Sequence, residues 1–151
     1  MTVEKLKNVM PVRDFAHYNI RAPRELLDRL CAFYQEVVGL TLGPRPPFTR
    51  FGYWLYAGDR PVLHLGEAAA HETCATDVSG TFNHAAFNCT NRGAFERRLT
   101  EMRVPYRTAE VPLTGQIQLF CRDPAGNGVE LCFASDDTAR QGESRHCDEP
   151  D

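Results

Sequence analysis

Four side chains that could bind one metal ion recur at a regular spacing along the 151-residue chain. His84 follows His17 by 67 positions, and Glu130 follows His64 by 66. Glu130 lies in the apolar run GVELCF, where an ionised carboxylate is costly unless a cation or hydrogen bonds compensate it. A divalent metal ion held by these four residues would compensate it. Imidazole and carboxylate together suit Zn, Ni, Fe(II), Mn or Co.

Each of these residues also has a purely structural interpretation. A single histidine in a strand is more often hydrogen-bonded within the protein than bound to metal. Glu130 could pair with Arg21 or Arg122 in a salt bridge without function. The spacing favours the metal interpretation, because two independent pairs of potential ligands recur at nearly the same period. His71 and His146 lie outside this pattern and are interpreted as surface residues.

A predicted repeat of strands and helices accounts for the spacing. In the first half, residues 14–20 alternate like a strand, and a helix follows that begins at Pro23 and ends at Gly39, the residue types favoured at those positions. Three short strands come next, LTLGPRP, FGYWLYAG and PVLHLG. His17 therefore lies in the first strand of this half and His64 in the last.

The second half repeats this order. Residues 81–88 are predicted to be a strand that contains His84, and Asn91 begins a helix. The strands VPYRTAEV, GQIQLFCR and GVELCF follow, with the turn DPAGNG between the last two. The chain therefore predicts an α+β fold made of two βαβββ modules, at 14–67 and 81–134.

Alternation along the strands separates the candidate ligands from the apolar residues. His64 points away from Leu63 and Leu65, and Glu130 points away from its neighbours Val129 and Leu131. Each candidate ligand thus faces away from the side expected to pack on a helix. If the strands curl into one sheet, the four ligands can converge on its concave face.

The composition predicts a soluble, cytoplasmic protein with one domain at 14–134. It is 42% hydrophobic and 25% charged, and a net charge of −3 without a basic cluster predicts no nucleic-acid or membrane partner. No apolar run reaches the roughly 18 residues of a spanning helix, and the N-terminus lacks the apolar centre of a secretion signal. Residues 1–13 are predicted to be an extension, and residues 135–151 a disordered polar tail.

Five segments resemble, in order and spacing, the vicinal oxygen chelate superfamily, which includes glyoxalase I, fosfomycin thiol transferases, extradiol dioxygenases and bleomycin-binding proteins. They are FAHYNIRA, FYQEVVGL, PVLHLGE, FNHAAFNCTN and DPAGNGVEL, and the resemblance covers about residues 13 to 134. It implies that the paired modules form a mixed-sheet cup around one divalent metal ion. It also implies a homodimer whose metal site takes ligands from both subunits.

The resemblance also implies roles for individual residues. By position in the family, His17, His84 and Glu130 match the shared His, His, Glu ligands, and His64 matches the fourth ligand, which in glyoxalase I is usually Glu. Arg21 stands where glyoxalase I places a glutathione-contacting arginine. The bleomycin-binding branch lacks the metal ligands, so their presence here argues against that branch.

No single branch of the family matches at every position. Ala68 replaces the glutathione-contacting asparagine of glyoxalase I. Phe120 replaces the tyrosine that extradiol dioxygenases place ten positions before the Glu ligand, and the chain is shorter than theirs. Compared with the fosfomycin thiol transferases, the chain has the three shared metal ligands but lacks a convincing set of lysine and arginine residues to bind the phosphonate.

The leading hypothesis is a metal-dependent, glyoxalase I-like lyase or isomerase that acts on a small substrate with vicinal oxygens. The metal would stabilise an enediolate or alkoxide, and Glu130 would move a proton on the carbon α to a carbonyl. Candidate substrate-binding residues are Arg21, Tyr53, Trp54 and Tyr56, although the aromatic ones could equally be wall residues. One alternative is an Fe(II) or Mn(II) extradiol-type dioxygenase or a thiol transferase. Another is a non-catalytic small-molecule binding protein.

Overall fold

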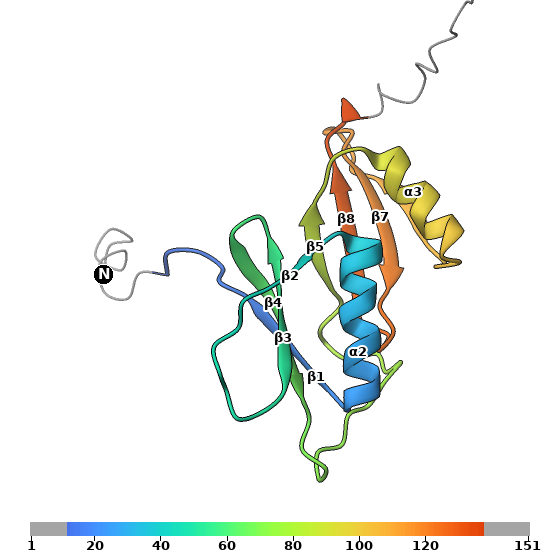
Figure 1. Ribbon diagram of the computed structural model, residues 1–151. Coiled ribbons are helices and arrows are strands. Elements are labelled where there is room, and N and C mark those ends of the chain that lie inside the picture. Colours follow the sequence, from blue (N-terminus) through green and yellow to red (C-terminus); the bar gives the residue numbers. More distant parts are fainter. Residues whose placement is uncertain (1–11, 138–151) are drawn as a thin grey trace, which may run out of the picture.

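The computed structural model describes residues 12–137, which form two βαβββ modules (Figure 1). Module one contains β1 (Tyr18–Ala22), α2 (Arg24–Phe33), the π-helical turn η1 (Tyr34–Val38), β2 (Thr41–Gly43), β3 (Gly52–Ala57) and β4 (Arg60–Glu67). Module two contains β5 (His84–Asn88), α3 (Arg92–Glu101), β6 (Arg107–Glu110), β7 (Ile117–Arg122) and β8 (Gly128–Phe133). The predicted α+β class and paired modules are confirmed.

Each module contributes one mixed four-stranded sheet. The strand orders are β1-β4-β3-β2 and β5-β8-β7-β6. The first strand of each module is parallel to the last, and the remaining pairs are antiparallel. This common topology explains the two sequence offsets of 67 and 66 residues, because His17 and His84 occupy equivalent places, as do His64 and Glu130.

Two strands begin later than their sequence pattern predicts. His17 immediately precedes β1, because pairing with β4 starts only at Tyr18, opposite Leu63. β5 begins at His84 rather than at residue 81, because its partner β8 begins at Gly128, directly opposite His84, after the preceding turn. The local alternation persists beyond the hydrogen-bonded part of each strand and so overestimates its length.

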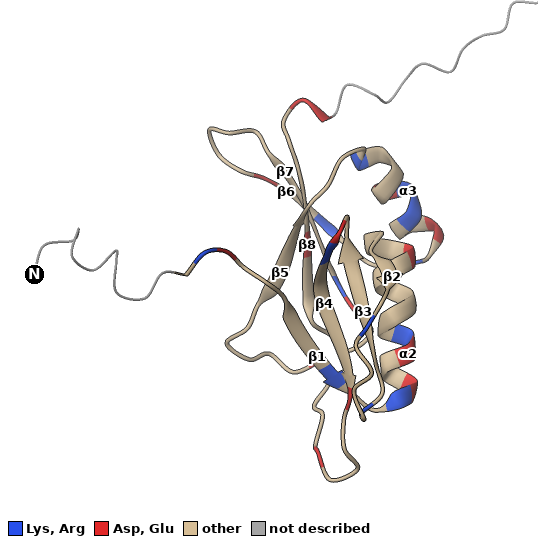
Figure 2. Ribbon diagram, turned by 60° about the vertical axis from the view of Figure 1, so that its left-hand side comes forward, with Lys and Arg blue, Asp and Glu red and all other residues tan. Residues whose placement is uncertain are grey.

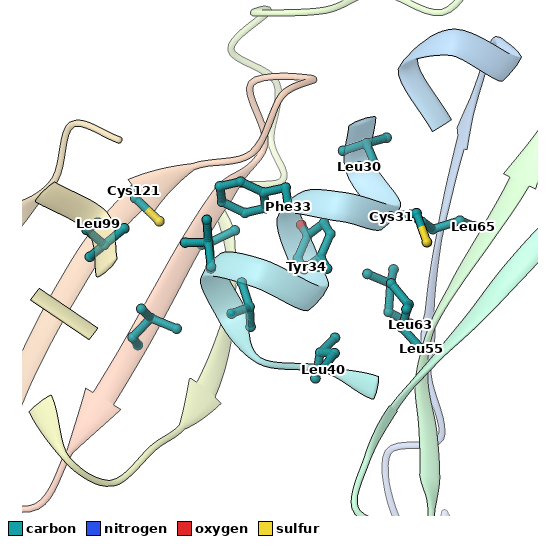
Figure 3. Packing of buried hydrophobic residues seen from close by; sticks show 14 of the residues in the cluster. Leu30, Cys31, Phe33, Tyr34, Leu40, Leu55, Leu63, Leu65, Leu99 and Cys121 are labelled. Atoms are coloured by element: carbon teal, nitrogen blue, oxygen red, sulfur yellow. The ribbon is translucent and has the colours of Figure 1, made fainter. Parts of the chain in front are cut away.

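A single hydrophobic core joins the modules, and α2 with η1 lies between the two sheets (Figure 3). From the first sheet, Leu63 and Leu65 are fully buried in this core, and from the second sheet, Val129 and Leu131. The charged residues of α2 lie along its exposed side (Figure 2). The faces of the sheets that carry Leu63 and Leu131 are therefore turned inward, and the opposite faces are turned away from α2.

Local signals define the ends of both helices. Pro23 precedes α2, and Gly39, with a φ of 87°, follows η1 in the left-handed conformation that glycine adopts without strain. The side chain of Asn91 accepts a hydrogen bond from the backbone N–H of Ala94 at the start of α3. Asp137, within the predicted tail, also accepts hydrogen bonds from the backbone at this end of α3.

The turn between β7 and β8 connects the second module to the first. Tyr34 in η1 donates its hydroxyl proton to Asp123 Oδ2 at 2.8 Å. Asp123 also accepts from the backbone N–H groups of Ala125 and Asn127, each at 2.9 Å, and from the Asn127 amide at 3.0 Å. Asp123 is 4% exposed, so these donors compensate a buried carboxylate. The DPAGNG segment therefore has a structural function.

Neither the predicted extension nor the predicted tail is described in full, because residues 1–11 and 138–151 lie outside the described residues. Within residues 12–137, no helix has the length and apolar character needed to span a membrane.

Candidate metal centre

The outer face of the first sheet carries a stack of three aromatic rings. His64, in β4, lies between the imidazole of His17 and the indole of Trp54, with ring centroids 3.7 Å and 4.0 Å away. The corresponding ring planes differ by only 16° and 8°. Trp54 contacts His64 because the two residues lie directly opposite each other in the β3–β4 pairing. Nε2 of His64 is buried and has no hydrogen-bond partner among residues 12–137.

Burial in this stack favours the neutral form of His64. Desolvation is the main cause that lowers the pKa of His64 below its usual 6.5, and the adjacent His17 lowers it further. The ring is therefore neutral at physiological pH, which is the form that can present a lone pair to a metal ion.

Acidification is expected to destabilise the folded protein through His64. Because its pKa is lower in the folded than in the unfolded chain, the neutral ring contributes stability above about pH 6.5, and this contribution is lost as the pH falls through the lowered pKa. His64→Phe keeps a ring in the stack but cannot be protonated. Urea unfolding at about pH 5 and about pH 7.5 should show a smaller acid-induced loss for His64→Phe than for the wild type. Equal losses would contradict this assignment.

The second sheet pairs a histidine with a buried carboxylate. His84 Nε2 lies 2.7 Å from Glu130 Oε2, and His84 Nδ1 lies 2.7 Å from Asn83 Oδ1. A neutral ring that donates from Nδ1 to Asn83 directs the lone pair of Nε2 toward Glu130, as an ion shared by His84 and Glu130 requires. A protonated ring instead donates from both nitrogens. Asn83 thus orients His84 in either form.

Glu130 is 5% exposed although it lies on the outer face of its sheet. Gln118 Nε2 donates to Glu130 Oε1 at 2.5 Å, and Cys132 Sγ donates to the same oxygen at 2.9 Å. Burial, followed by the hydrogen bond to Glu130, raises the pKa of the Cys132 thiol to about 12, so the thiol remains a donor. These groups compensate Oε1, and the contact with His84 is made by Oε2. In the described part of the chain, neither Arg21 nor Arg122 forms a salt bridge with Glu130.

A cavity of about 510 Å³ adjoins His84 on this face. Phe120 forms part of the cavity wall and lies directly opposite Glu130 in the β7–β8 pairing. Its ring packs edge-on against the imidazole of His84, with the ring centroids 5.7 Å apart. Gly128 also lines the cavity, opposite His84. A Cβ at Gly128 would lie 2.1 Å from the carbonyl oxygen of Asn83, so only glycine allows the two strands to approach this closely.

The condition for convergence of all four candidate ligands within one chain is not met, because the strands form two separate four-stranded sheets. Among residues 12–137, no three His, Cys, Asp or Glu side chains lie close enough together to hold a metal ion. The structure instead places His17 with His64 and His84 with Glu130. Because α2 and η1 pack between the sheets, each pair lies on the strand face opposite the residues buried in that shared core.

The two pairs fit a divalent metal ion to different degrees. The 2.7 Å between His84 Nε2 and Glu130 Oε2 is the length of a direct hydrogen bond, and opening it to about 2.8–3.6 Å would let both atoms bind one ion at about 2.0–2.2 Å. His17 and His64 are stacked in nearly parallel planes, so one ion cannot lie in both planes, as their lone pairs require. Module two therefore presents a fitting pair of donors, and module one offers one imidazole at a time unless a ring turns.

The three aromatic residues predicted to bind substrate do not share one face. Trp54 stacks on His64 on the outer face, and Tyr56 points to the same side of β3. Tyr53 lies on the opposite side, where its hydroxyl donates to Asp28 in α2 at 2.7 Å. Tyr53 therefore packs against the helix and cannot line a site formed with His64.

Arg21 is held by an ion pair at the end of β1. Its Nε donates to Glu72 Oε2 at 2.9 Å, and Arg50 contacts the same carboxylate. These contacts, with the hydrogen bond from Arg21 as the largest cause, lower the pKa of Glu72 to about 2. A substrate carboxylate would have to displace Glu72 in order to engage Arg21.

Three contacts of this site were not predicted from the sequence. Asn83 orients His84, and Gln118 and Cys132 hold Glu130. Strand alternation places Cys132 on the face of Glu130. In contrast, the position of Gln118 depends on the pairing of β7 with β8, in which Gln118 lies opposite Cys132. No local pattern encodes that register.

The sequence and the fold match one superfamily. Residues 15–131 match the Glyoxalase/Bleomycin resistance protein/Dioxygenase superfamily. A curated relative, Glyoxylase I 4 from Arabidopsis thaliana, is 36% identical over 111 residues, which are 70% of this chain and 63% of the relative. The chain thus spans less than two thirds of that relative's length.

Solved structures show the same architecture. A glyoxylase/bleomycin resistance protein/dioxygenase domain from Frankia sp. matches with a TM-score of 0.65 at 17% identity, over 82% of this chain and 99% of the domain. Lactoylglutathione lyase from Agrobacterium tumefaciens matches with a TM-score of 0.58 at 22% identity, over 83% of this chain and 97% of the lyase. The fosfomycin resistance protein FosX from Listeria monocytogenes matches with a TM-score of 0.62 at 12% identity, over 82% of this chain and 95% of FosX.

These structural matches show the fold, and the sequence match extends over nearly all of both modules. The protein therefore belongs to the Glyoxalase/Bleomycin resistance protein/Dioxygenase superfamily.

Proposed function

We propose that this protein is a metal-dependent, glyoxalase I-like lyase or isomerase that acts on a small substrate with vicinal oxygens. The observation that carries this proposal is the pair of His84 and Glu130, whose facing atoms lie 2.7 Å apart beside a cavity. Asn83 orients the imidazole, and Glu130 is buried with one oxygen held by two donors. Such surroundings are typical of metal ligands.

The proposed ligands of one divalent ion are His17, His84 and Glu130, with His64 as the fourth candidate. A second copy of the chain supplies the missing pair, because the two pairs of one chain lie on faces turned away from their shared core. In a symmetric homodimer, module one of each chain then faces module two of the other, and two equivalent sites result.

In this proposal Glu130 is the general base. A bound divalent ion supplies Lewis-acid stabilisation of the negative charge that develops on the substrate oxygens. Glu130 removes a proton from the carbon α to the carbonyl and returns it to the neighbouring carbon. Gln118 and Cys132 keep the carboxylate in place, and Phe120 and Trp54 provide apolar walls that exclude water.

The stacking of His64 favours a second candidate function. If His64 stays between His17 and Trp54, the remaining set of His17, His84 and Glu130 is a two-histidine, one-carboxylate triad, which suits Fe(II) and leaves positions open for oxygen and substrate. An extradiol-type dioxygenase is therefore the alternative. Phe120 has no hydroxyl group to donate a proton beside Glu130, which favours the lyase or isomerase.

The decisive experiment measures both activities on protein loaded separately with Zn, Ni, Co, Mn and Fe(II). The proposal expects isomerisation of the hemithioacetal of methylglyoxal and glutathione with at least one of the first four ions. Oxygen consumption with a catechol by the Fe(II) form alone would establish the alternative. No metal binding and no activity in any form would leave a non-catalytic binding protein.

Mixing two inactive variants tests the two-chain site. His17→Ala and Glu130→Ala each damage both sites of their own homodimer, but a mixed dimer contains one intact site. After subunit exchange, about a quarter of the wild-type activity should return, because half of the dimers are mixed and each has one active site of two. A site formed within one chain would give no recovery.

A further inference from the structure

Two arginines without a carboxylate partner line the cavity beside His84. Arg107, in β6, places its guanidinium 3.9 Å from the ring centroid of Phe120, and Arg122, at the end of β7, donates to the carbonyl of Gly126 at 2.7 Å. Within residues 12–137, neither arginine forms an ion pair. Among the described residues, no Asp or Glu lines the cavity. Its charge is thus positive although the chain carries a net charge of −3.

The strand register places these arginines on the same face as the proposed ligands. Arg107 lies opposite Phe120, and Phe120 lies opposite Glu130. Arg122 lies opposite Gly128, which in turn lies opposite His84. Arg122, Gly128 and His84 all line the same cavity.

The simplest alternative is that Arg107 only stacks on Phe120. Such cation–π contacts are common on protein surfaces and need no ligand. That alternative accounts for Arg107, but it does not account for a second arginine in the same cavity or for the lack of any acidic residue there. Two guanidinium groups that face one cavity without acidic partners are an arrangement suited to a bound anion.

We propose that the substrate is an anion whose carboxylate or phosphonate group binds Arg107 and Arg122 while its vicinal oxygens face His84 and Glu130. A cavity of about 510 Å³ accommodates such a small molecule. This assignment of a substrate class rests on the proposed function of the site. The affinity for the anionic group, in contrast, is a property of the metal-free protein and can be measured without catalysis.

The test uses three fluorinated probes of similar shape on the metal-free protein, followed by ¹⁹F NMR. They are 4-fluorobenzoate, 4-fluorophenylphosphonate and the uncharged 4-fluorobenzamide. At least one anion should bind about tenfold more tightly than the amide, and the stronger of the two identifies the anionic group. Binding of neither anion, or equal binding of anion and amide, would overturn the proposal.

Variants locate the binding. Arg107→Met should weaken the preferred anion about tenfold and Arg107→Lys less, because lysine keeps the charge but not the planar fork. Arg97→Met, which removes an exposed arginine from α3, is the matched control and should change nothing. Arg122→Lys is the second variant, since it retains a donor near Gly126. Equal effects of Arg97→Met and Arg107→Met would refute the assigned site.

The outcomes separate this inference from the proposed function. Anion binding that depends on Arg107, in a protein without activity in any metal form, would support the anion site and refute the enzyme. Hemithioacetal isomerisation that is unchanged in Arg107→Met, together with no anion binding, would support the enzyme and refute the anion site.

Discussion

Replacing Glu130 by alanine is expected to lower kcat/KM of the metal-loaded protein by about 10²–10⁴-fold, the usual contribution of a general base. The loss has two causes. Glu130 provides a proposed metal ligand through Oε2, 2.7 Å from His84, and it is the proposed base. The measurements are steady-state kinetics and the metal content of the protein after dialysis.

Neighbouring variants distinguish these two functions of Glu130. Gln118→Leu removes the donor to Oε1 but keeps the carboxylate, so it should weaken metal binding about 10–100-fold, as do other losses of a hydrogen bond to a ligand. Glu110→Gln, at an exposed carboxylate in β6, is the control and should match the wild type. A Glu130→Ala protein that retained both metal and activity would exclude Glu130 from the site.

Replacing Asp123 by alanine is expected to lower the free energy of unfolding by about 3 kcal/mol, because several buried donors lose their acceptor at once. These are the hydroxyl of Tyr34, the backbone N–H groups of Ala125 and Asn127, and the side-chain amide of Asn127. Urea unfolding followed by circular dichroism measures the change.

Two further variants define what Asp123 does. Tyr34→Phe removes only the bond between the modules and should cost about 1 kcal/mol. Asp59→Ala, in the exposed turn before β4, should stay within about 0.5 kcal/mol of the wild type. A Tyr34→Phe loss equal to that of Asp123→Ala would show that the contact between modules, rather than the turn, accounts for the whole effect.

The chain determines by itself those features that depend on near neighbours. Alternation correctly placed His64 on the strand face away from the buried Leu63 and Leu65. It also placed Glu130 on the face away from Val129 and Leu131, because successive side chains of a strand point to opposite faces. Gly39 and Asn91 correctly marked helix ends, because conformational freedom and capping act within a few residues. The repeated spacing predicted the paired modules.

The same rule of alternation also separates the aromatic residues that the sequence interpretation grouped together. Trp54 and Tyr53 are adjacent, so they cannot line the same face of β3. Only the packing of α2 decides which of them faces inward, and Tyr53 does so through Asp28. A shift of one residue in that packing would exchange their environments.

Tertiary structure alone decided which candidate ligands meet. The sequence determined the four residues and their faces, whereas the packing of α2 and η1 between the two sheets separated His17 and His64 from His84 and Glu130. Register likewise set the partners of Glu130, since Gln118 reaches it only through the β7–β8 pairing. The physical reason is that alternation and capping act over a few residues, whereas sheet pairing and core packing depend on contacts between residues far apart in the chain.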